Sequence, residues 1–193
     1  MFLIAALGNP GSKYAMTRHN IGFMAADYWL KSLGGSDWRD EHKAQTKKFK
    51  IEGKEVLLVK PQTYMNLSGE SVVALMNFYK IDRANLLVVH DEVDFAFGTI
   101  KMQFNRSAGG QNGVKSITQL LGTQEYARLR MGVGRPSHPD FALADYVLGN
   151  FSKEEQTNLD KVLDTASDAI ESFILEGINK ASTKFNGPVK LEP

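Results

Sequence analysis

The chain of 193 residues contains no cysteine, which excludes disulfides, thiol nucleophiles and thiolate metal sites. It also lacks an apolar run of the roughly 18–20 residues that a membrane span needs. The N-terminus, Met1-Phe2-Leu3-Ile4, has no basic stretch before it of the kind that opens a signal peptide. We therefore expect a cytoplasmic protein with no membrane partner, whose chemistry depends on His, carboxylate, hydroxyl, amide or Lys side chains.

A strong overall charge is lacking too, because the formal net charge is only +1. The charge is unevenly distributed, however. Residues 99–135 contain six basic residues and one acid, a charge of +5, whereas residues 136–176 contain two basic residues and nine acids, a charge of −7. A polyanion partner needs a local positive field rather than a high overall charge. Residues 99–135 are thus a candidate surface for a polyanion, unless the opposite charges cancel on neighbouring surfaces.

Apolar runs and helical patterns alternate along the chain, which is typical of an α/β architecture. The runs at residues 2–7 and 86–89 predict buried strands, and Gly53-Lys54 sits at the turn of a predicted hairpin. Further predicted strands lie at 99–104 and, half-buried, at 128–133. Helices are predicted after the N-cap Asn20, after Ser68 and from about Gly113 to Leu121, and the capping box Ser152–Glu155 is predicted to open the longest helix. We predict one α/β domain over residues 1–193, with three layers and a central mixed β-sheet flanked by helices. Residues from about 183 to 193 are expected to form a loose tail.

Polar residues follow several of the predicted strands, where ligands bind in α/β proteins. Asn9, Asn66, Asp91 and Asn112 occupy such positions, and His19 precedes a predicted helix. A His whose one ring nitrogen is held by a carboxylate can take a proton from water with the other. No activated Ser or Cys motif is present, so the nucleophile of such a site would be water.

Each of these residues also has a simpler interpretation. A lone His before a helix is more often a capping or packing residue, and Asn in Gly-containing loops is favoured by turn geometry. Asp91, Glu92 and Asp94 could instead hold a divalent cation, although adjacent residues of a continuing strand would point apart. Gly109–Gly113, before a helix, offers backbone N–H groups suited to a phosphate or carboxylate.

Six short motifs follow one another along most of the chain. They are G-N-P-G with Tyr14 and T-R-H-N (residues 8–20), Pro61 with T-Y-M-N-L-S-G (63–69), V-V-H-D-E-V-D (88–94), G-G-x-N-G-x-K-S (109–116), R-L-R-M-G-V-G-R-P (128–136) and Y-V-L-G-N-F (146–151). Together they resemble the bacterial peptidyl-tRNA hydrolase family. The resemblance implies a single α/β domain that cleaves the ester between a peptide, or an N-acyl-aminoacyl group, and the terminal ribose of tRNA. It thereby recycles peptidyl-tRNA released from stalled ribosomes.

The resemblance also implies roles for individual residues. His19 would be the catalytic base, Asp91 its partner, and Asn9 a substrate-positioning residue that stabilises the developing oxyanion. No metal and no cofactor are implied. The implied substrate and tRNA contacts are Tyr14, Tyr64, Met65, Asn66, Gly109, Asn112 and Arg130, the last of these gripping an acceptor-stem phosphate. The implied partner is peptidyl-tRNA, bound through its acceptor stem and terminal CCA, and the protein is expected to be a monomer.

Two positions depart from the family pattern. Gln111 stands where many members have His, so any contribution of that His is missing. The family's basic residue before the glycine loop falls on Gln103, which leaves Lys101 or Arg106 to make that phosphate contact.

Two other functions remain open from the sequence. A non-catalytic RNA-binding module on the same fold, such as one that assists splicing, would keep the basic surface without needing His19 and Asp91. A metal-dependent hydrolase or nuclease would use the acids of residues 91–94 and lose activity with a chelator.

Overall fold

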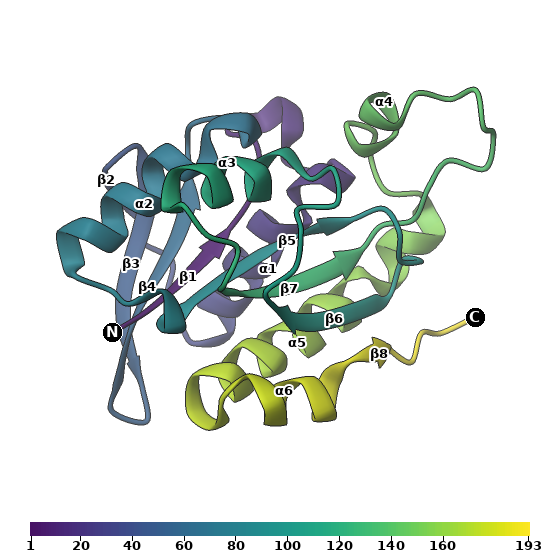
Figure 1. Cartoon of the computed structure of the whole chain (residues 1–193). Coiled ribbons are helices and arrows are strands. Elements are labelled where there is room, and N and C mark those ends of the chain that lie inside the picture. Colours follow the sequence, from purple (N-terminus) through teal and green to yellow (C-terminus); the bar gives the residue numbers. More distant parts are fainter.

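All 193 residues are described by a computed structural model, in which one central sheet lies between two layers of helices (Figure 1). The sheet has eight strands in the order β2-β3-β4-β1-β5-β7-β6-β8. Their bounds are β1 (Phe2–Ala6), β2 (Arg39–Glu41), β3 (Ala44–Ile51), β4 (Lys54–Pro61), β5 (Leu86–Glu92), β6 (Thr99–Phe104), β7 (Ala127–Gly132) and β8 (Gly187–Pro188). The contacts of β1 with β4 and β5, and of β5 with β7, are parallel. The remaining contacts are antiparallel, which confirms the predicted mixed sheet.

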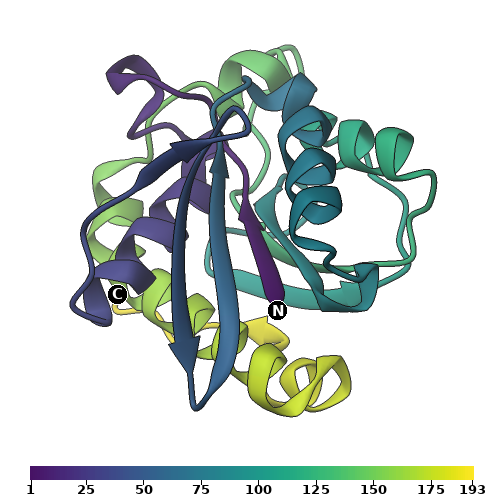
Figure 2. The ribbon, with the colours of Figure 1, turned by 90° about the vertical axis from the view of Figure 1, so that its left-hand side faces the viewer.

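Helices cover both faces of the sheet, which Figure 2 shows nearly edge-on. One face packs against α1 (Ile21–Ser32), α5 (Lys153–Glu176) and α6 (Ile178–Phe185), and the other against α2 (Ser68–Tyr79) and α3 (Asn112–Leu121). Successive strand residues point to opposite faces, so Leu87 and Val89 enter the first core and Leu86 and Val88 the second. The three-layer α/β arrangement predicted from the sequence is confirmed. The predicted capping box at Ser152 and Glu155 opens α5. None of the helices is both long enough and apolar enough to cross a membrane.

A close backbone approach fixes the start of α1 against the carboxyl ends of the central strands. A Cβ added at Gly22 would lie 2.5 Å from the carbonyl oxygen of Leu7 and 2.7 Å from that of Val89. Only glycine allows this approach, because any side chain would meet backbone atoms that cannot move aside. The residues just before α1, including His19, are therefore held beside the end of β5.

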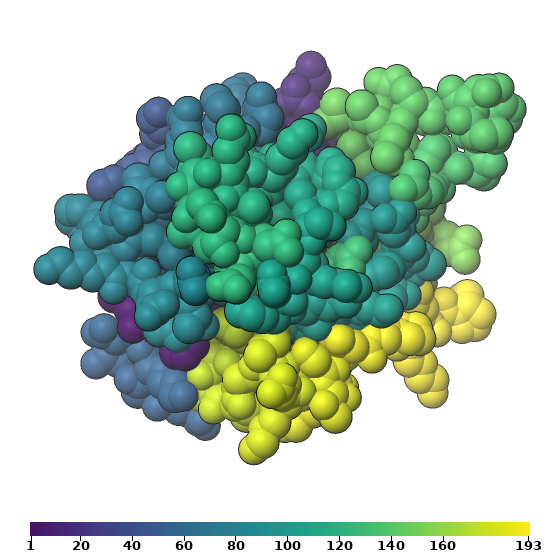
Figure 3. Space-filling model, viewed as in Figure 1, coloured from purple at the N-terminus to yellow at the C-terminus, as the bar shows by residue number.

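The C-terminal residues have more contacts than a loose tail would need. Residues 183–185 belong to α6, and β8 pairs with β6. The side chain of Asn186 accepts from the N–H of Met102 and donates to its carbonyl, which binds the chain to the sheet edge. Farther on, Glu192 binds Asn158 and Lys161 of α5. The yellow C-terminal residues accordingly lie along the body of the molecule in Figure 3.

Candidate active site

His19 and Asp91 are brought together by segments that are 72 residues apart in the chain. His19 lies in the single-turn helix η2 (Arg18–Asn20), and Asp91 lies near the carboxyl end of β5. The Nδ1 atom of His19 is 2.7 Å from Oδ2 of Asp91, and the side chains are 14% and 3% exposed. Burial lowers the pKa of His19, but the charge of Asp91 and its hydrogen bond outweigh burial, so the pKa is raised above 6.5. The Asp91 carboxylate thereby favours the protonated form of the imidazole.

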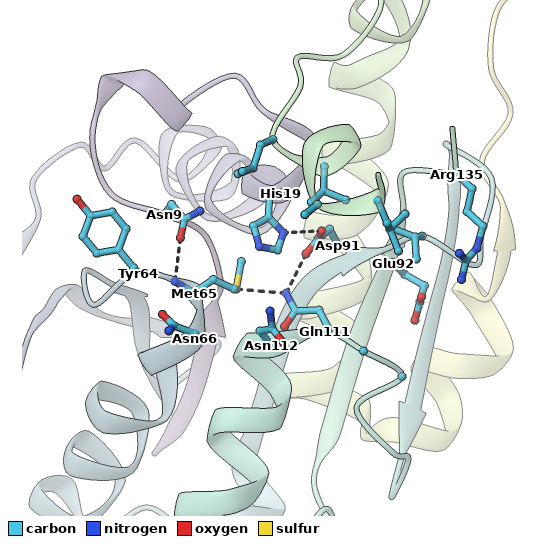
Figure 4. Close-up of a pocket in the computed structure, with 17 residues that line it drawn as sticks. Asn9, His19, Tyr64, Met65, Asn66, Asp91, Glu92, Gln111, Asn112 and Arg135 are labelled. Carbon is cyan, nitrogen blue, oxygen red and sulfur yellow. Dashed lines mark hydrogen bonds and ion pairs between the residues drawn. The ribbon is translucent and has the colours of Figure 1, made fainter. Parts of the chain in front are cut away.

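The second ring nitrogen of His19, Nε2, has no partner within the protein, and the imidazole lines a pocket of about 460 Å³ (Figure 4). Because Nδ1–H donates to Asp91, Nε2 carries the lone pair and can accept a proton. Tyr64, Met65 and Asn66 line one side of the pocket, and Gly109, Gly110 and Asn112 line another. Tyr64 is 55% exposed and stands at the rim.

Asn9 has a side chain whose orientation is determined by its contacts. Its backbone N–H and carbonyl are both bound by the side-chain amide of Asn20, at 2.8 and 2.9 Å. Its Oδ1 accepts from the N–H of Met65 at 2.8 Å. Because Oδ1 is engaged in this way, Nδ2 is left as a donor at the pocket. Asn20 was expected only to cap α1, but its side chain makes no cap bond and locks Asn9 instead.

Hydrogen bonds, together with the backbone between His19 and Asn20, link the residues around the pocket into a closed ring. Figure 4 shows the dashed contacts that run from Asn9 to Met65, Gln111, Asp91 and His19. The ring closes because His19 is followed in sequence by Asn20, which holds Asn9. Displacement of one member therefore strains the others, so that the His19 imidazole and the Asn9 amide keep a defined separation.

Gln111 is a site residue that the sequence analysis missed. That position was taken as a lost contribution, since many family members have His there. In the structure, Nε2 of Gln111 is 2.9 Å from Oδ1 of Asp91 and 3.2 Å from the sulfur of Met65. No sequence signal points to this contact, because it depends on where the loop before α3 folds.

The apolar wall of the pocket was also missed. It is formed by Leu143, Ala144, Val147 and Leu148, in and after the short helix α4 (Leu143–Val147). Figure 3 shows the segment around α4 standing out at one corner of the molecule.

Arg18 joins this wall to the segment that carries His19. Its guanidinium donates to the carbonyl of Tyr146 at 3.3 Å and to Glu155 at 3.1 Å, and its carbon lies 4.2 Å from the centre of the Tyr146 ring. The backbone N–H of Arg18 also donates to the carbonyl of Gly149. The wall and the segment that carries His19 are therefore linked through Arg18.

Two of the basic residues that contribute to the charge of residues 99–135 are engaged by other groups of the protein. Arg128 is buried and donates to Nε2 of His90 at 3.3 Å and to the carbonyl of Ser107 at 2.6 Å. Arg130 is bound to Glu92, with Nε 2.8 Å from the carboxylate, and to Gln103. Arg130 does not line the pocket. The phosphate contact that the resemblance implies for Arg130 would have to be made by a side chain that is 13% exposed and already paired with Glu92.

The acids that could have formed a metal site diverge. Asp91 faces His19 and Gln111, Glu92 faces Arg130, and Asp94 binds Arg135. No group of three or more His, Asp or Glu side chains is arranged to hold a metal ion. The residue positions do not support the alternative of a metal-dependent hydrolase.

Most of the residues expected at the site do converge on the pocket. Those that line it are Asn9, His19, Tyr64, Met65, Asn66, Asp91, Gly109 and Asn112. Tyr14 stays outside but packs edge-to-face on Tyr64, with ring centres 6.4 Å apart. Lys101 and Arg106 also lie outside the pocket. They belong to β6 and to the loop that follows it.

Fold and site together define a single-domain α/β hydrolytic enzyme in which a His–Asp pair opens onto a pocket with an apolar wall. The peptidyl-tRNA hydrolase family profile matches residues 3–192, and the chain belongs to that family. Similar proteins include the peptidyl-tRNA hydrolases of Bdellovibrio bacteriovorus, 54% identical over 96% of this chain and 100% of that protein, and of Desulforamulus reducens, 47% identical over 96% and 89%. The crystal structure of peptidyl-tRNA hydrolase from Acinetobacter baumannii has a TM-score of 0.90 at 33% identity, covering 98% of this chain and 96% of that one.

The second histidine of the site region, His90, should stay neutral. It is completely buried, and burial, together with the nearby charge of Arg128, lowers its pKa to about 3. In an NMR titration from about pH 8 to about pH 5, we expect the ring signals of His90 not to move while those of His19 do. Titration of His90 near pH 6.5 would contradict the buried, Arg128-bound arrangement.

Proposed function

We propose that the protein hydrolyses the ester between a peptide, or an N-acyl-aminoacyl group, and the terminal ribose of tRNA, and that His19 activates the attacking water. The observation that carries this proposal is the His19–Asp91 pair, whose unpartnered Nε2 lines the pocket. Membership of the peptidyl-tRNA hydrolase family supports the substrate. Recycling of peptidyl-tRNA released from stalled ribosomes is the role that follows from this substrate.

The steps follow from the hydrogen-bond roles of the two side chains. Nε2 of His19 takes a proton from water as the water oxygen attacks the ester carbonyl. Asp91 holds the other nitrogen as the donor and stabilises the imidazolium that forms. When the tetrahedral intermediate collapses, the ribose oxygen leaves and takes the proton back from the imidazolium. No metal takes part in this sequence.

Asn9 is suited to stabilise the charge on the carbonyl oxygen. Its Oδ1 is held by Met65, so Nδ2 is the atom available to the substrate. A donor that is already oriented costs no reorganisation when negative charge develops in the transition state. Asn66 and Asn112, which are exposed at the pocket, would hold the peptide backbone, the water or the terminal nucleotide.

The pocket favours an N-acylated substrate over a free aminoacyl group. Its two carboxylates are both engaged, Asp91 by His19 and Gln111 and Glu92 by Arg130. A free α-ammonium would therefore lose water without gaining an anionic partner, which is unfavourable. The apolar wall at α4 would contact the peptide side chains, and Tyr14, Tyr64 and Met65 would contact peptide or bases.

The acceptor stem would contact the face of β6 that points away from α5 and α6. Ile100 and Met102 enter the core on the α5 side, so Lys101 and Gln103 point to the opposite face. Lys101 and the exposed Arg106 form no ion pairs within the protein, whereas Arg130 is paired with Glu92. We assign the phosphate contact to Lys101 and Arg106, with Arg130, the cross-strand neighbour of Lys101, holding Glu92 and Gln103. A monomer acting in the cytoplasm completes the proposal.

A non-catalytic RNA-binding module is the less favoured function. It would need the cations of β6 but not a base held by a buried carboxylate, and this chain has both.

Replacing the base should abolish most of the chemistry. His19→Ala should lower kcat on N-acetyl-aminoacyl-tRNA by about 10²–10⁴-fold. The rate should fall as pH drops through the raised pKa of His19, since only the neutral ring accepts a proton, and Asp91→Asn should move that limb to lower pH. The double variant should lose far less than the product of the single losses. His138→Ala, on an exposed histidine, is the control. Retention of most activity in His19→Ala contradicts the mechanism.

Replacing the phosphate contacts should affect binding rather than chemistry. Lys101→Ala and Arg106→Ala should raise KM with little change in kcat, because a remote contact acts equally in ground and transition states. Each should also reduce the slope of log KM against log salt by about one. Lys180→Ala, on exposed α6 at the other face of the sheet, serves as the matched control. Equal losses on a short substrate without the acceptor-stem phosphates would contradict this assignment.

A further inference from the structure

Both ends of the Gln111 side-chain amide are engaged. Oε1 accepts from the N–H of Val114 at 2.9 Å and so caps the start of α3, while Nε2 donates to Oδ1 of Asp91 at 2.9 Å. The orientation of the amide is unambiguous, because a backbone N–H can only donate and a carboxylate can only accept. The helix cap thereby aims the N–H₂ group of Gln111 at Asp91.

The two oxygens of Asp91 are divided between two partners. Oδ2 binds His19 and Oδ1 binds Gln111, and these are the only side chains that form hydrogen bonds with the carboxylate. The side chain is 3% exposed, so solvent contributes little to holding it. Rotation of the carboxylate away from His19 would break the bond to Gln111 as well.

We propose that Gln111 is a positioning residue that acts on His19 through Asp91: as a donor that never ionises, it binds Oδ1 and offsets part of the negative potential that the carboxylate exerts on the imidazole. This inference rests on the proposed function, in which His19 is the base.

The other charged groups around the pair are already occupied. On β5, His90 is neutral, and Glu92 is bound to Arg130 of β7. Arg128 of β7 contacts His90 and the carbonyl of Ser107 rather than Asp91. On the side of α4 and α5, Arg18 pairs with Glu155, and Arg135 pairs with Asp94. Gln111 is therefore the neighbour that can weaken the effect of the Asp91 charge on His19 without itself carrying a charge.

The direction of the effect follows from the dipole of the amide. Its N–H end lies against Asp91 and offsets part of the negative potential that Asp91 exerts on His19. Loss of this donor should leave more of that potential at His19 and stabilise the imidazolium. The pKa of His19 should then rise, and less of the base should be available at neutral pH.

Two substitutions separate this role from helix capping. Gln111→Ser keeps an N-cap acceptor for α3, but it is too short to reach Asp91. Gln111→Met has similar length and supplies neither the donor nor the cap. Gln119→Ser, at an exposed position of α3 with no side-chain hydrogen bond, is the matched control.

The experiment is an NMR titration of the His19 ring in each variant without substrate, together with the pH profile of kcat/KM on N-acetyl-aminoacyl-tRNA. We expect both Gln111 variants to raise the pKa of His19 and the acid limb of the profile by about half a unit. Both variants should lower Tm, because Asp91 loses a donor, and Gln111→Met should lower it by about 2–4 °C more than Gln111→Ser, through loss of the cap. In an Asp91→Asn background, Gln111→Ser should leave the pKa of His19 unchanged.

An unchanged His19 pKa in either Gln111 variant, or a shift that persists in the Asp91→Asn background, overturns the inference and leaves Gln111 as a cap only. The proposed function fails separately, if the wild-type protein does not cleave the N-acylated substrate while the titrations follow the expected order.

Discussion

Asp91 lies at the end of a central strand with 3% of its side chain exposed, and a carboxylate so placed needs hydrogen-bond donors from the protein. Two side-chain donors reach this carboxylate, from opposite directions. His19 is brought by the segment before α1, and Gln111 by the start of α3. Because the same carboxylate satisfies both, the positions of η2 and α3 depend on one another. Asn9 and Met65 extend this dependence to the loops after β1 and β4.

The charges beneath the pocket are neutralised or buried within the protein. Arg130 binds Glu92, and Arg128 reaches His90 and the backbone of the glycine loop. These contacts hold the loop that carries Gln111 and Asn112, and they leave the reacting region without an unpaired cation or anion apart from the His–Asp pair. Unpaired positive charge is found farther out, at Lys101 and Arg106. In the proposed function, ester cleavage therefore depends on the His–Asp pair, and the attraction of tRNA phosphates depends on Lys101 and Arg106.

Much of the fold could be predicted from the sequence because its signals are local. The apolar runs of β1 and β5, the Gly53 turn and the capping box at Ser152 each act within a few residues. Signals of two or three residues were too short to detect, as for β2 and β8. The strand at 128–133 was expected to be half-buried, but both of its faces are covered, since the loop after β6 folds over Arg128.

At the site, the residue types suggested a His–carboxylate pair, whereas its surroundings depended on tertiary contacts. The number of charges in residues 99–135 could not show that Arg130 forms an ion pair with Glu92. The reach of Gln111 to Asp91 depends on the loop conformation, and the wall at α4 comes from a helix of five residues, too short for an amphipathic pattern.

The central claim is that water activated by His19, without a metal, cleaves the ester of an N-acylated aminoacyl-tRNA. It is tested most directly by measuring release of the N-acetyl amino acid from N-acetyl-aminoacyl-tRNA in the presence and absence of EDTA, with unacylated aminoacyl-tRNA in parallel. The account predicts much faster release from the acylated substrate, with rates that EDTA changes by less than about twofold. Comparable rates on both substrates, or activity that EDTA removes and Mg²⁺ restores, would contradict it.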